Sequence, residues 1–486
     1  MHNATSADNG SLPPGPRQHA NITVIGTGYL GATHAVCMAS LGLTVTGIDV
    51  DAGKISSLSQ GHLPFFEPGL EELLRTALDS GRLTFTTDFA AAAGADVHFL
   101  CIGTPQAPDS PAADLTFVYA GVRRLAPHLT HKCLIAGKST VPIGTAQRLT
   151  ALVQATAPAG KLAELAWNPE FLREGHAIED TLHPDRLVFG VPSDWAREQL
   201  TACYTPIIDG GTPVIVTDLA TAELVKVAAN SFLATKISYI NAMAEICEAT
   251  GADVNHLASA LSYDNRIGGR FLKPGLGFGG GCLPKDIRAF AHRAKELGVG
   301  QAVGFLREVD AINQRRRQRT VDLITEMAFG DLTAVRITVL GAAFKPDSDD
   351  IRDAPALDVA RMLHQGGARV TVYDPKAMGN ASKTYPELAY APTLEKAVAG
   401  AEIVALLTEW DEFRRADPAV LGELVQLRNI VDGRHALDAA AYRAAGWDYR
   451  ALGTPTPSTT GGPVPTQLPA LARHTGQIDR ARAARS

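Results

Sequence analysis

The sequence predicts an α/β protein with two doubly wound parallel-sheet units and a long helix between them in the chain. An apolar stretch at residues 21–25 runs into a glycine-rich turn, a helix and a second apolar stretch that ends in an acid. A similar outline returns after residue 331, which indicates an internal duplication. Between these two units, residues 218–250 contain neither Pro nor Gly and are predicted to form one uninterrupted helix.

Length and composition set the class of protein. The chain has 486 residues, 45% of them hydrophobic and 20% charged, which is typical of two or three globular domains. A net charge of -6 gives no basic footprint for nucleic acid, and no apolar run reaches the roughly 18 residues of a membrane span. The polar, Pro/Gly-rich residues 1–20 and the Pro/Thr/Ser-rich residues 452–486 are predicted to be disordered tails.

The cysteines indicate the compartment. Six of them are scattered without CxxC spacing, so we expect reduced thiols, a cytoplasmic location and no zinc or other metal site. They are Cys37, Cys101, Cys133, Cys203, Cys247 and Cys282. The polar N-terminus has no apolar core and does not resemble a signal peptide.

The first unit carries a dinucleotide-binding pattern. The predicted strand at residues 21–25 leads into Gly26-Thr27-Gly28-Tyr29-Leu30-Gly31, and a helix is expected from there through Leu41. The second strand, residues 44–48, ends on Asp49, 23 residues after Gly26. Glycines let the backbone approach a pyrophosphate at a helix N-terminus, and the acid binds ribose hydroxyls. Because a carboxylate repels a 2′-phosphate, the pattern favours NAD over NADP.

Polar residues follow three further predicted strands, at the carboxyl edge where open α/β sheets bind ligands. Residues 95–102 lead to Gly103-Thr104-Pro105, residues 133–137 to Lys138-Ser139-Thr140, and residues 162–167 to residues 168–174. Each group could simply cap the next helix. Three in succession indicate a site.

The long helix predicted over residues 218–250 carries Lys226 and Asn230, which are four residues apart and therefore share one face. Taken alone, Lys226 could be a solvated surface charge, but its neighbours are apolar, which favours a desolvated, functional amine. A further helix is expected over residues 302–327, and its run Arg315-Arg316-Arg317 is interpreted as a solvated face.

A cysteine lies in a glycine-rich loop between these helices. Residues 275–287 read GLGFGGGCLPKDI, with five glycines in the first seven positions. Such a loop forms neither helix nor strand, and it suits close approach of a ligand to the backbone. The simplest alternative is a buried Cys in a turn. Beside Lys285, however, Cys282 is expected to favour the thiolate, the nucleophilic form.

The second α/β unit begins at Ala334. Its stretches VRITVLG, ARVTVYDP and AEIVALLTEW match NITVIG, LTVTGIDV and ADVHFLCIGTP of the first unit. Gly341-Ala-Ala-Phe344 stands where a glycine fingerprint would be. We therefore expect this unit to bind something other than a dinucleotide pyrophosphate.

Together these motifs resemble the UDP-glucose/GDP-mannose dehydrogenase family over residues 21–446. GTGYLG, GTP, KST, NPEFLREG, the Lys226/Asn230 helix, FLKPGLGFGGGCLPKD, GAAFKPDSDDIRD and DGR at 432–434 occur in the family's order. The resemblance implies an NAD-binding Rossmann-like domain at residues 21–217, a central helical and dimerisation domain with the Cys loop at 218–330, and a UDP-sugar-binding Rossmann-like domain at 331–451. It also implies a homodimer or higher homo-oligomer, with no nucleic-acid or membrane partner.

The resemblance further implies a four-electron oxidation of UDP-glucose to UDP-glucuronate that uses two NAD per sugar. Cys282 would form a thiohemiacetal and then a thioester, while Lys226 and Asn230 would stabilise the oxyanion. Glu170 would act as base on the hydrolytic water, assisted by Thr140 and Asp286.

Binding residues carry over by position. The resemblance implies cofactor contacts at Asp49, Lys54, Thr104, Thr140, Glu174, Lys285 and Arg352, beside the fingerprint residues Gly26, Gly28, Tyr29, Leu30 and Gly31. The resemblance implies substrate contacts at Glu170, Phe171, Leu172, Arg173, Glu174, Lys226, Arg266, Phe271, Leu272, Lys273, Pro274, Gly275, Gly279, Lys345 and Arg434. Of Arg266 and Arg434, one could serve the site of a neighbouring subunit. Gly281 departs from the Ser that many relatives have before the nucleophile.

Three alternatives remain open from the sequence. The same chemistry could act on another nucleotide sugar such as GDP-mannose. A two-electron 3-hydroxyacid dehydrogenase would share the first unit and the Lys/Asn pair, but would need neither Cys282 nor the second unit. A non-catalytic NAD sensor or scaffold would not need this set of polar residues.

Overall fold

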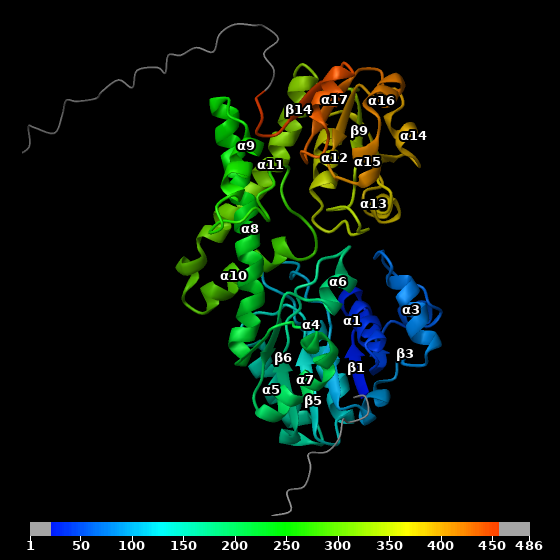
Figure 1. Cartoon of the computed structure of the whole chain (residues 1–486), viewed down its shortest axis with the longest axis vertical. Helices are drawn as coiled ribbons and strands as arrows, with labels where there is room; N and C mark the ends of the chain where they lie inside the picture. The colour runs from blue at the N-terminus through cyan, green and yellow to red at the C-terminus, as the bar shows by residue number, and fades with distance from the viewer. Residues whose placement is uncertain (1–20, 456–486) are drawn as a thin grey trace, which may run out of the picture.

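The computed structural model of the protein describes residues 21–455 (Figure 1). The predicted tail at 1–20, and the part of the second predicted tail that covers 456–486, lie outside the described residues. The start of that second tail packs against the protein: Leu452 is buried, the Gly453 N–H donates to Glu248 Oε1 at 2.8 Å, and the Gly453 carbonyl accepts from the Val254 N–H at 3.0 Å. The packed chain therefore continues past the expected domain end at residue 451.

The N-terminal domain is built on an eight-stranded sheet with the order β3-β2-β1-β4-β5-β6-β7-β8. Neighbouring strands are parallel except β6 and β7, which are antiparallel. The strands are β1 (Asn21–Ile25), β2 (Thr44–Ile48), β3 (Leu83–Thr86), β4 (Val97–Leu100), β5 (Cys133–Gly137), β6 (Ala163–Trp167), β7 (Leu187–Gly190) and β8 (Val214–Thr217). The carboxyl ends of β1, β4, β5 and β6 thus meet at one edge, as predicted.

The C-terminal domain repeats this architecture. Its six-stranded, fully parallel sheet has the order β11-β10-β9-β12-β13-β14, which is the order of the first six strands of the N-terminal sheet. The strands are β9 (Arg336–Leu340), β10 (Arg369–Tyr373), β11 (Ala389–Tyr390), β12 (Ile403–Leu406), β13 (Asn429–Asp432) and β14 (Asp448–Ala451). The predicted duplication and the two Rossmann-like domains are confirmed.

Helices cover both sheets, and each domain buries its own apolar core. In the N-terminal domain they are α1 (Tyr29–Ser40), α2 (Ala52–Ser59), α3 (Leu70–Asp79), α4 (Thr116–Leu125), α5 (Thr145–Thr156), α6 (Ala177–Leu182) and α7 (Asp194–Asp209). In the C-terminal domain they are α12 (Pro355–Gln365), α13 (Met378–Thr384), α14 (Leu394–Val398), α15 (Asp411–Arg415), α16 (Pro418–Leu424) and α17 (Ala439–Ala444). No helix within residues 21–455 is both long and apolar enough to cross a bilayer.

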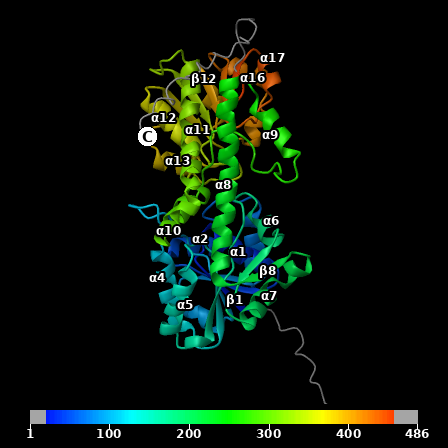
Figure 2. The ribbon, with the colours of Figure 1, turned by 90° about the vertical axis from the view of Figure 1, so that its left-hand side faces the viewer.

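Four helices form the middle of the molecule: α8 (Leu219–Thr250), α9 (Val254–Ser262), α10 (Leu283–Glu296) and α11 (Phe305–Met327). Asp218 caps the 32-residue α8 by accepting the Thr221 N–H at 2.8 Å, and Gly251 ends it with φ +74°. Figure 2 shows α8 running from the N-terminal domain to the C-terminal domain, with α11 beside it. The predicted long helix is confirmed.

The arginine run on α11 corrects one expectation. Arg316 is fully buried and pairs with Glu248 at 3.1 Å, and Arg317 is 3% exposed and pairs with Asp353 at 2.8 Å. The side chain of Arg315 alone is half exposed. The interpretation of the run as a solvated face is therefore wrong for two of its three residues, which hold α11 against α8 and the C-terminal domain.

Candidate active site

The glycine-rich loop that precedes α10 lies tightly against protein on several sides. A Cβ on Gly277, whose φ is +101°, would lie 2.5 Å from Asn313 Oδ1, and one on Gly279 would lie 2.2 Å from the Asp353 carbonyl oxygen. Asn313 also accepts the Phe278 N–H at 2.7 Å. The sequence suggested that a ligand approaches these glycines closely. In this structure α11 and the C-terminal domain approach Gly277 and Gly279 instead, and this packing fixes the loop in place.

Cys282 stands at the end of this loop, as the N-cap residue of α10. Of the six cysteines, all of which lie in the described residues, Cys282 is exposed and the other five are buried. The alternative of a buried structural Cys in a turn is thus excluded. At a helix N-terminus the unpaired N–H groups favour negative charge on the sulfur.

The charge state of Cys282 differs from the expectation. Although solvent reaches the residue, protein atoms crowd the sulfur, and this desolvation with the nearby Asp286 raises the pKa of the thiol to about 11 against the opposing charges of Lys226 and Lys285. Lys285 Nζ is bonded to Asp286 Oδ1 at 2.5 Å. Lys285 therefore favours the thiolate, as expected, but burial and Asp286 outweigh it, so the expectation of a readily ionised Cys282 is wrong.

Lys226 is the buried cation of the site. It is 5% exposed, and its Nζ lies 3.1 Å from Glu170 Oε1. Burial lowers the pKa of Lys226, but Glu170, Cys282 and Asp286 together outweigh it and hold the pKa above the ordinary value, so the amine stays charged. The prediction of a desolvated amine is confirmed.

Asn230 and Asp286 complete the cluster. Asn230, one turn after Lys226 on α8, is also buried, and its Nδ2 donates to Asp286 Oδ2 at 2.7 Å. Asp286 is 3% exposed. Its carboxylate accepts one hydrogen bond from Asn230 on α8 and another from Lys285. The shared face predicted for the Lys/Asn pair is confirmed, and Asp286 fixes the amide orientation.

The strand-end residues face this cluster. Thr104 Oγ1, after β4, donates to the Thr140 carbonyl, after β5, at 2.7 Å. Both line a cleft whose opposite wall includes Lys285 and Asp286 of α10. The prediction that successive strand ends meet at a site is confirmed for these residues and for Glu170.

The turn after β1 fits a dinucleotide. Gly26 adopts φ +89°, and a Cβ on Gly31 would lie 1.8 Å from the Gly26 carbonyl oxygen, so only glycine permits this contact between helix and strand. A Cβ on Gly28 would meet no described atom within 4 Å, which leaves open space over the turn. Within the described residues no side chain caps α1, so its first N–H groups are available to a phosphate.

Asp49 lies beside this turn, at the end of β2. Its Oδ2 accepts the Thr27 N–H at 2.7 Å and Lys54 Nζ at 3.0 Å, and its Oδ1 accepts the Asp51 N–H at 3.1 Å. Burial raises the pKa of Asp49, but these bonds outweigh it and lower the pKa below the ordinary value. An ion pair of Asp49 and Lys54 therefore stands beside the turn after β1.

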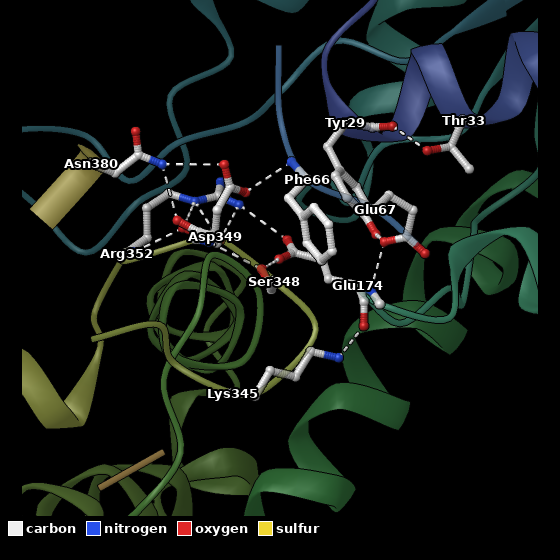
Figure 3. Close-up of polar contacts among 12 residues, drawn as sticks. Tyr29, Thr33, Phe66, Glu67, Glu174, Lys345, Ser348, Asp349, Arg352 and Asn380 are labelled. Carbon is white, nitrogen blue, oxygen red and sulfur yellow. Dashed lines mark hydrogen bonds and ion pairs between the residues drawn. The ribbon is translucent and has the colours of Figure 1, made fainter. Parts of the chain in front are cut away.

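Glu174 joins the two domains (Figure 3). Its Oε2 accepts from Ser348 Oγ at 2.9 Å and its Oε1 from Arg352 Nη2 at 3.3 Å, while Lys345 Nζ donates to its carbonyl oxygen. Burial, with the nearby Asp350, raises the pKa of Glu174 to about 7. The structure thus brings together three residues predicted separately, and adds Ser348, which sequence reasoning missed.

Residues 170–173 reach the site from the end of β6. The Leu172 N–H donates to Glu170 Oε2 at 2.7 Å, and the Phe171 ring lies 5.4 Å from Lys226 Nζ. Arg173 is 2.6 Å from Asp180 on α6. Phe171 and Leu172 therefore lie beside the catalytic cluster, whereas Arg173 is held by α6.

The remaining predicted substrate residues divide into two groups. Arg434 is engaged by protein: it donates to the carbonyls of Leu407 at 2.8 Å, Gly277 at 3.1 Å and Phe344 at 3.1 Å. Arg266, by contrast, has a 90% exposed side chain paired with Asp264. The structure does not bring Arg266 to the cluster.

The predicted substrate segment 271–275 is partly exposed and partly buried. Phe271 is exposed with φ +65°, Lys273 is exposed, and Leu272, Pro274 and Gly275 are buried. The Gly275 N–H donates to Asn241 Oδ1 at 2.9 Å, which fixes the segment to α8.

Sequence reasoning quoted Lys138 in a motif but gave it no role. It is buried, and its Nζ lies 3.1 Å from both Asn168 Oδ1 and the Tyr204 hydroxyl. Burial lowers the pKa of Lys138 to about 8. It was missed because a Lys after a strand looks like any surface Lys in the sequence.

The C-terminal domain has an acid in the position of Asp49, but uses it differently. Asp374 follows β10 and is 1% exposed. Its Oδ2 accepts the N–H groups of Ala342 at 2.7 Å and Ala343 at 2.9 Å and the Trp410 indole N–H at 3.0 Å. Asp374 therefore differs from Asp49 in its extra donor from Trp410 and in having no lysine partner in the described residues.

The fold and the site define an oxidoreductase with a dinucleotide site on one Rossmann-like domain and an accessible thiol near the second. Comparison with known protein families identifies the family of oxidoreductases. The UDP-glucose/GDP-mannose dehydrogenase family matches with its NAD binding domain over residues 20–208, its central domain over 220–315 and its UDP binding domain over 338–439. The chain belongs to this family, and NAD is its cofactor.

Relatives and solved structures agree. The chain is 41% identical to a UDP-glucose 6-dehydrogenase of Rhizobium meliloti (strain 1021) over 89% of this chain and 99% of that protein. It is 40% identical to one of Bacillus subtilis (strain 168) over 89% and 93%. A UDP-glucose dehydrogenase structure from Pyrobaculum islandicum has a TM-score of 0.83 at 37% identity, covering 92% of this chain and all of that chain.

Proposed function

We propose that this protein oxidises UDP-glucose to UDP-glucuronate, with two NAD reduced per sugar. The observation that carries the proposal is the accessible Cys282 beside the buried Lys226 and Asn230, a nucleophile and two donors in one cluster. A two-electron alcohol dehydrogenase needs no such nucleophile. The names of the relatives at about 40% identity support UDP-glucose as the sugar nucleotide.

The cofactor would be held by the α1 N-terminus, by Gly28 and by the Asp49/Lys54 pair, with Thr104 and Thr140 lining the neighbouring cleft. When bound there, NAD accepts a hydride in each of the two oxidations. The carboxylate of Asp49 excludes a 2′-phosphate by charge repulsion, which favours NAD over NADP.

Cys282 carries the second half of the reaction. Its sulfur adds to the C6 aldehyde, the carbonyl π bond breaks, and the thiol proton ends on the oxygen of the thiohemiacetal. Lys226 and Asn230 stabilise negative charge on that oxygen, an effect typically worth about 3 kcal/mol per donor. After oxidation the same carbon is a thioester of Cys282.

Hydrolysis of the thioester then falls to Glu170. Glu170 takes a proton from water, the water oxygen bonds to the carbonyl carbon, and the carbon–sulfur bond breaks to restore Cys282. The pairing of Glu170 with Lys226 at 3.1 Å supports this role, because it places the Glu170 carboxylate in the same cluster as Lys226 and Cys282.

We also propose that the protein is a homodimer that pairs through α8. Phe232, Tyr239 and Ile246 recur every seven residues on this helix and are 67%, 50% and 54% exposed. Such spacing gives one apolar stripe on a helix, and Figure 2 shows α8 along an outer face of the described chain. A second copy suits the stripe, because a two-fold axis across it would place like residues against one another.

The test of the dimer is the mass in solution. Phe232→Glu should convert the dimer to a monomer by light scattering, whereas Phe329→Glu, at a 98% exposed residue away from the stripe, should leave it dimeric. A wild-type monomer would refute the pairing.

The test of the activity is the count of NADH per sugar nucleotide, with UDP-glucose and GDP-mannose compared on the purified protein. Two NADH per UDP-glucose are expected. A ratio of one would assign the protein to the two-electron class, and turnover of GDP-mannose alone would change the substrate. Cys282→Ala should lose acid formation by several orders of magnitude. Cys282→Ser should accumulate an ester adduct, heavier by the sugar nucleotide in mass spectrometry.

A further inference from the structure

Glu67 lies between α2 and α3 and has no part in the reaction described above. It is 4% exposed, and its carboxylate is fully engaged (Figure 3). Oε2 accepts the Tyr29 hydroxyl and the Gly175 N–H, the latter at 2.6 Å, and Oε1 accepts the Ala177 N–H at 2.7 Å. The buried Glu67 carboxylate thus accepts hydrogen bonds from three donors in two separate segments, the turn at Tyr29 and the backbone at residues 175–177.

The two segments have different expected ligands, although Glu174 is expected to contact both. Tyr29 is the first residue of α1, in the turn that fits the dinucleotide. Gly175 and Ala177 follow Glu174, in the segment expected to hold the sugar nucleotide. Gly175 adopts φ +76°, and a Cβ there would lie 2.8 Å from the Asp347 backbone oxygen, so the second segment also lies against the C-terminal domain.

The chain of contacts continues across the domains. Glu174 is bonded to Ser348 at 2.9 Å and to Arg352 at 3.3 Å, and Lys345 donates to its carbonyl. Tyr29, Glu67, the backbone at 174–177 and residues 345–352 therefore form one continuous polar connection. It leads from the dinucleotide turn to the second domain.

We propose that Glu67 is a positioning residue that couples the dinucleotide turn to the sugar-nucleotide segment, so that each ligand strengthens the binding of the other. The inference rests on the proposed function, in which these two segments receive NAD and UDP-glucose. A ligand that fixes Tyr29 also fixes the Glu67 carboxylate, and the carboxylate holds the Gly175 and Ala177 amides in place for the second ligand.

A purely structural role for Glu67 makes a different prediction. Were Glu67 only an anchor for the start of α6, its bonds to Gly175 and Ala177 would suffice, and the Tyr29 hydroxyl would be dispensable. Tyr29→Phe removes that hydroxyl alone. Glu67→Gln leaves one backbone N–H facing an amide NH₂, because an amide offers a single acceptor atom where the carboxylate offers two.

The experiment is calorimetric titration of NADH, which does not react with UDP-glucose, with and without saturating UDP-glucose. In the wild type, UDP-glucose should tighten NADH binding at least about fivefold. Tyr29→Phe should lose this tightening while its affinity for UDP-glucose alone stays within about twofold. Glu67→Gln should lose the tightening and bind UDP-glucose alone about tenfold more weakly. The matched control is Glu72→Gln, at an exposed acid on α3, which should keep wild-type values.

Hydrogen exchange of the peptide that spans residues 172–180 separates this inference from the proposed function, since it needs no sugar. NADH should slow its exchange in the wild type and not in Tyr29→Phe. If the wild type fails to bind UDP-glucose, the proposed function fails while this readout still decides the coupling. Equal NADH protection in the wild type and Tyr29→Phe, or unchanged tightening in both variants, would overturn the inference. Should Glu67→Gln not fold, Tyr29→Phe decides alone.

Discussion

Ionisation of Cys282 is a measurable property of the site. The pKa of about 11 lies above the ordinary value of 9.0, so at neutral pH the thiolate fraction should be well below that of an ordinary cysteine, on the order of a hundredfold. Iodoacetamide reacts with the thiolate. Alkylation should therefore be slow at pH 7 and rise about tenfold per pH unit until the pH approaches the pKa.

Substitution of Asp286 by Asn tests the cause of this shift. Burial is the main reason for the high pKa of Cys282, and the Asp286 carboxylate adds to it. An asparagine keeps an acceptor for Asn230 but removes the charge, so the midpoint of alkylation should move to lower pH and the rate at pH 8 should rise. Lys226→Met should move the midpoint the opposite way, because the Lys226 charge opposes the shift.

The assay is alkylation rate against pH, followed by intact mass. Cys282→Ala supplies the background from the five buried cysteines. A wild-type midpoint at or below pH 9, or no change in Asp286→Asn, would refute the reasoning. If the high pKa of Cys282 is confirmed, the sulfur loses its proton only as the aldehyde arrives. The neutral thiol resists oxidation better than the thiolate, so Cys282 is protected between turnovers.

Three further predictions concern packing and charge. In Gly281→Ser the new Cβ would lie 2.2 Å from Arg352 Cζ. A crystal structure of this variant should therefore show Arg352 displaced, and the KM for NAD should be higher than in the wild type. An unmoved Arg352 would contradict this prediction. The pKa of Glu174 is raised to about 7, so its contribution to stability is full below about 4.5 and is lost as pH rises through 7. Glu174→Gln should hence have a higher Tm than the wild type at pH 8, with the difference vanishing near pH 4.5, and a constant difference would exclude this. Glu248→Gln leaves buried Arg316 without its charge partner and should cost about 3 kcal/mol in denaturant unfolding, whereas a loss below about 0.5 kcal/mol would show that the pair is not needed.

The sequence was sufficient for the sheets and for the long helix because their signals are local. Residues 21–25, 44–48 and 133–137 are short apolar runs between turns, and the structure has strands with those bounds. The helix predicted over 218–250 followed from the absence of Pro and Gly, and in the structure it begins at Leu219, with Asp218 as its cap. The antiparallel junction between β6 and β7 has no local signal, since orientation depends on which edge a strand joins.

The site was predictable where a residue's chemistry is written in its neighbours. Cys282 stands among glycines and Lys226 among apolar residues, and the structure confirms the burial of Lys226 but not the low pKa expected for Cys282. Long-range partners were not predictable: Arg316 lies 68 positions from Glu248, and a charge run looks the same whether it meets solvent or an acid. Glu67 likewise lies 108 positions from the Gly175 amide that it binds.

Helix α8 sets the spacing of the whole enzyme. Lys226 near one end points into the active site, and Glu248 near the other holds Arg316 and the end of the C-terminal sheet. These 22 positions correspond to about 33 Å of continuous helix. Lys226 and the contacts at Glu248 are therefore carried by one rigid element. Because α8 is continuous between them, any rotation of one domain relative to the other would have to occur beyond these two positions, and it would leave the distance between them unchanged.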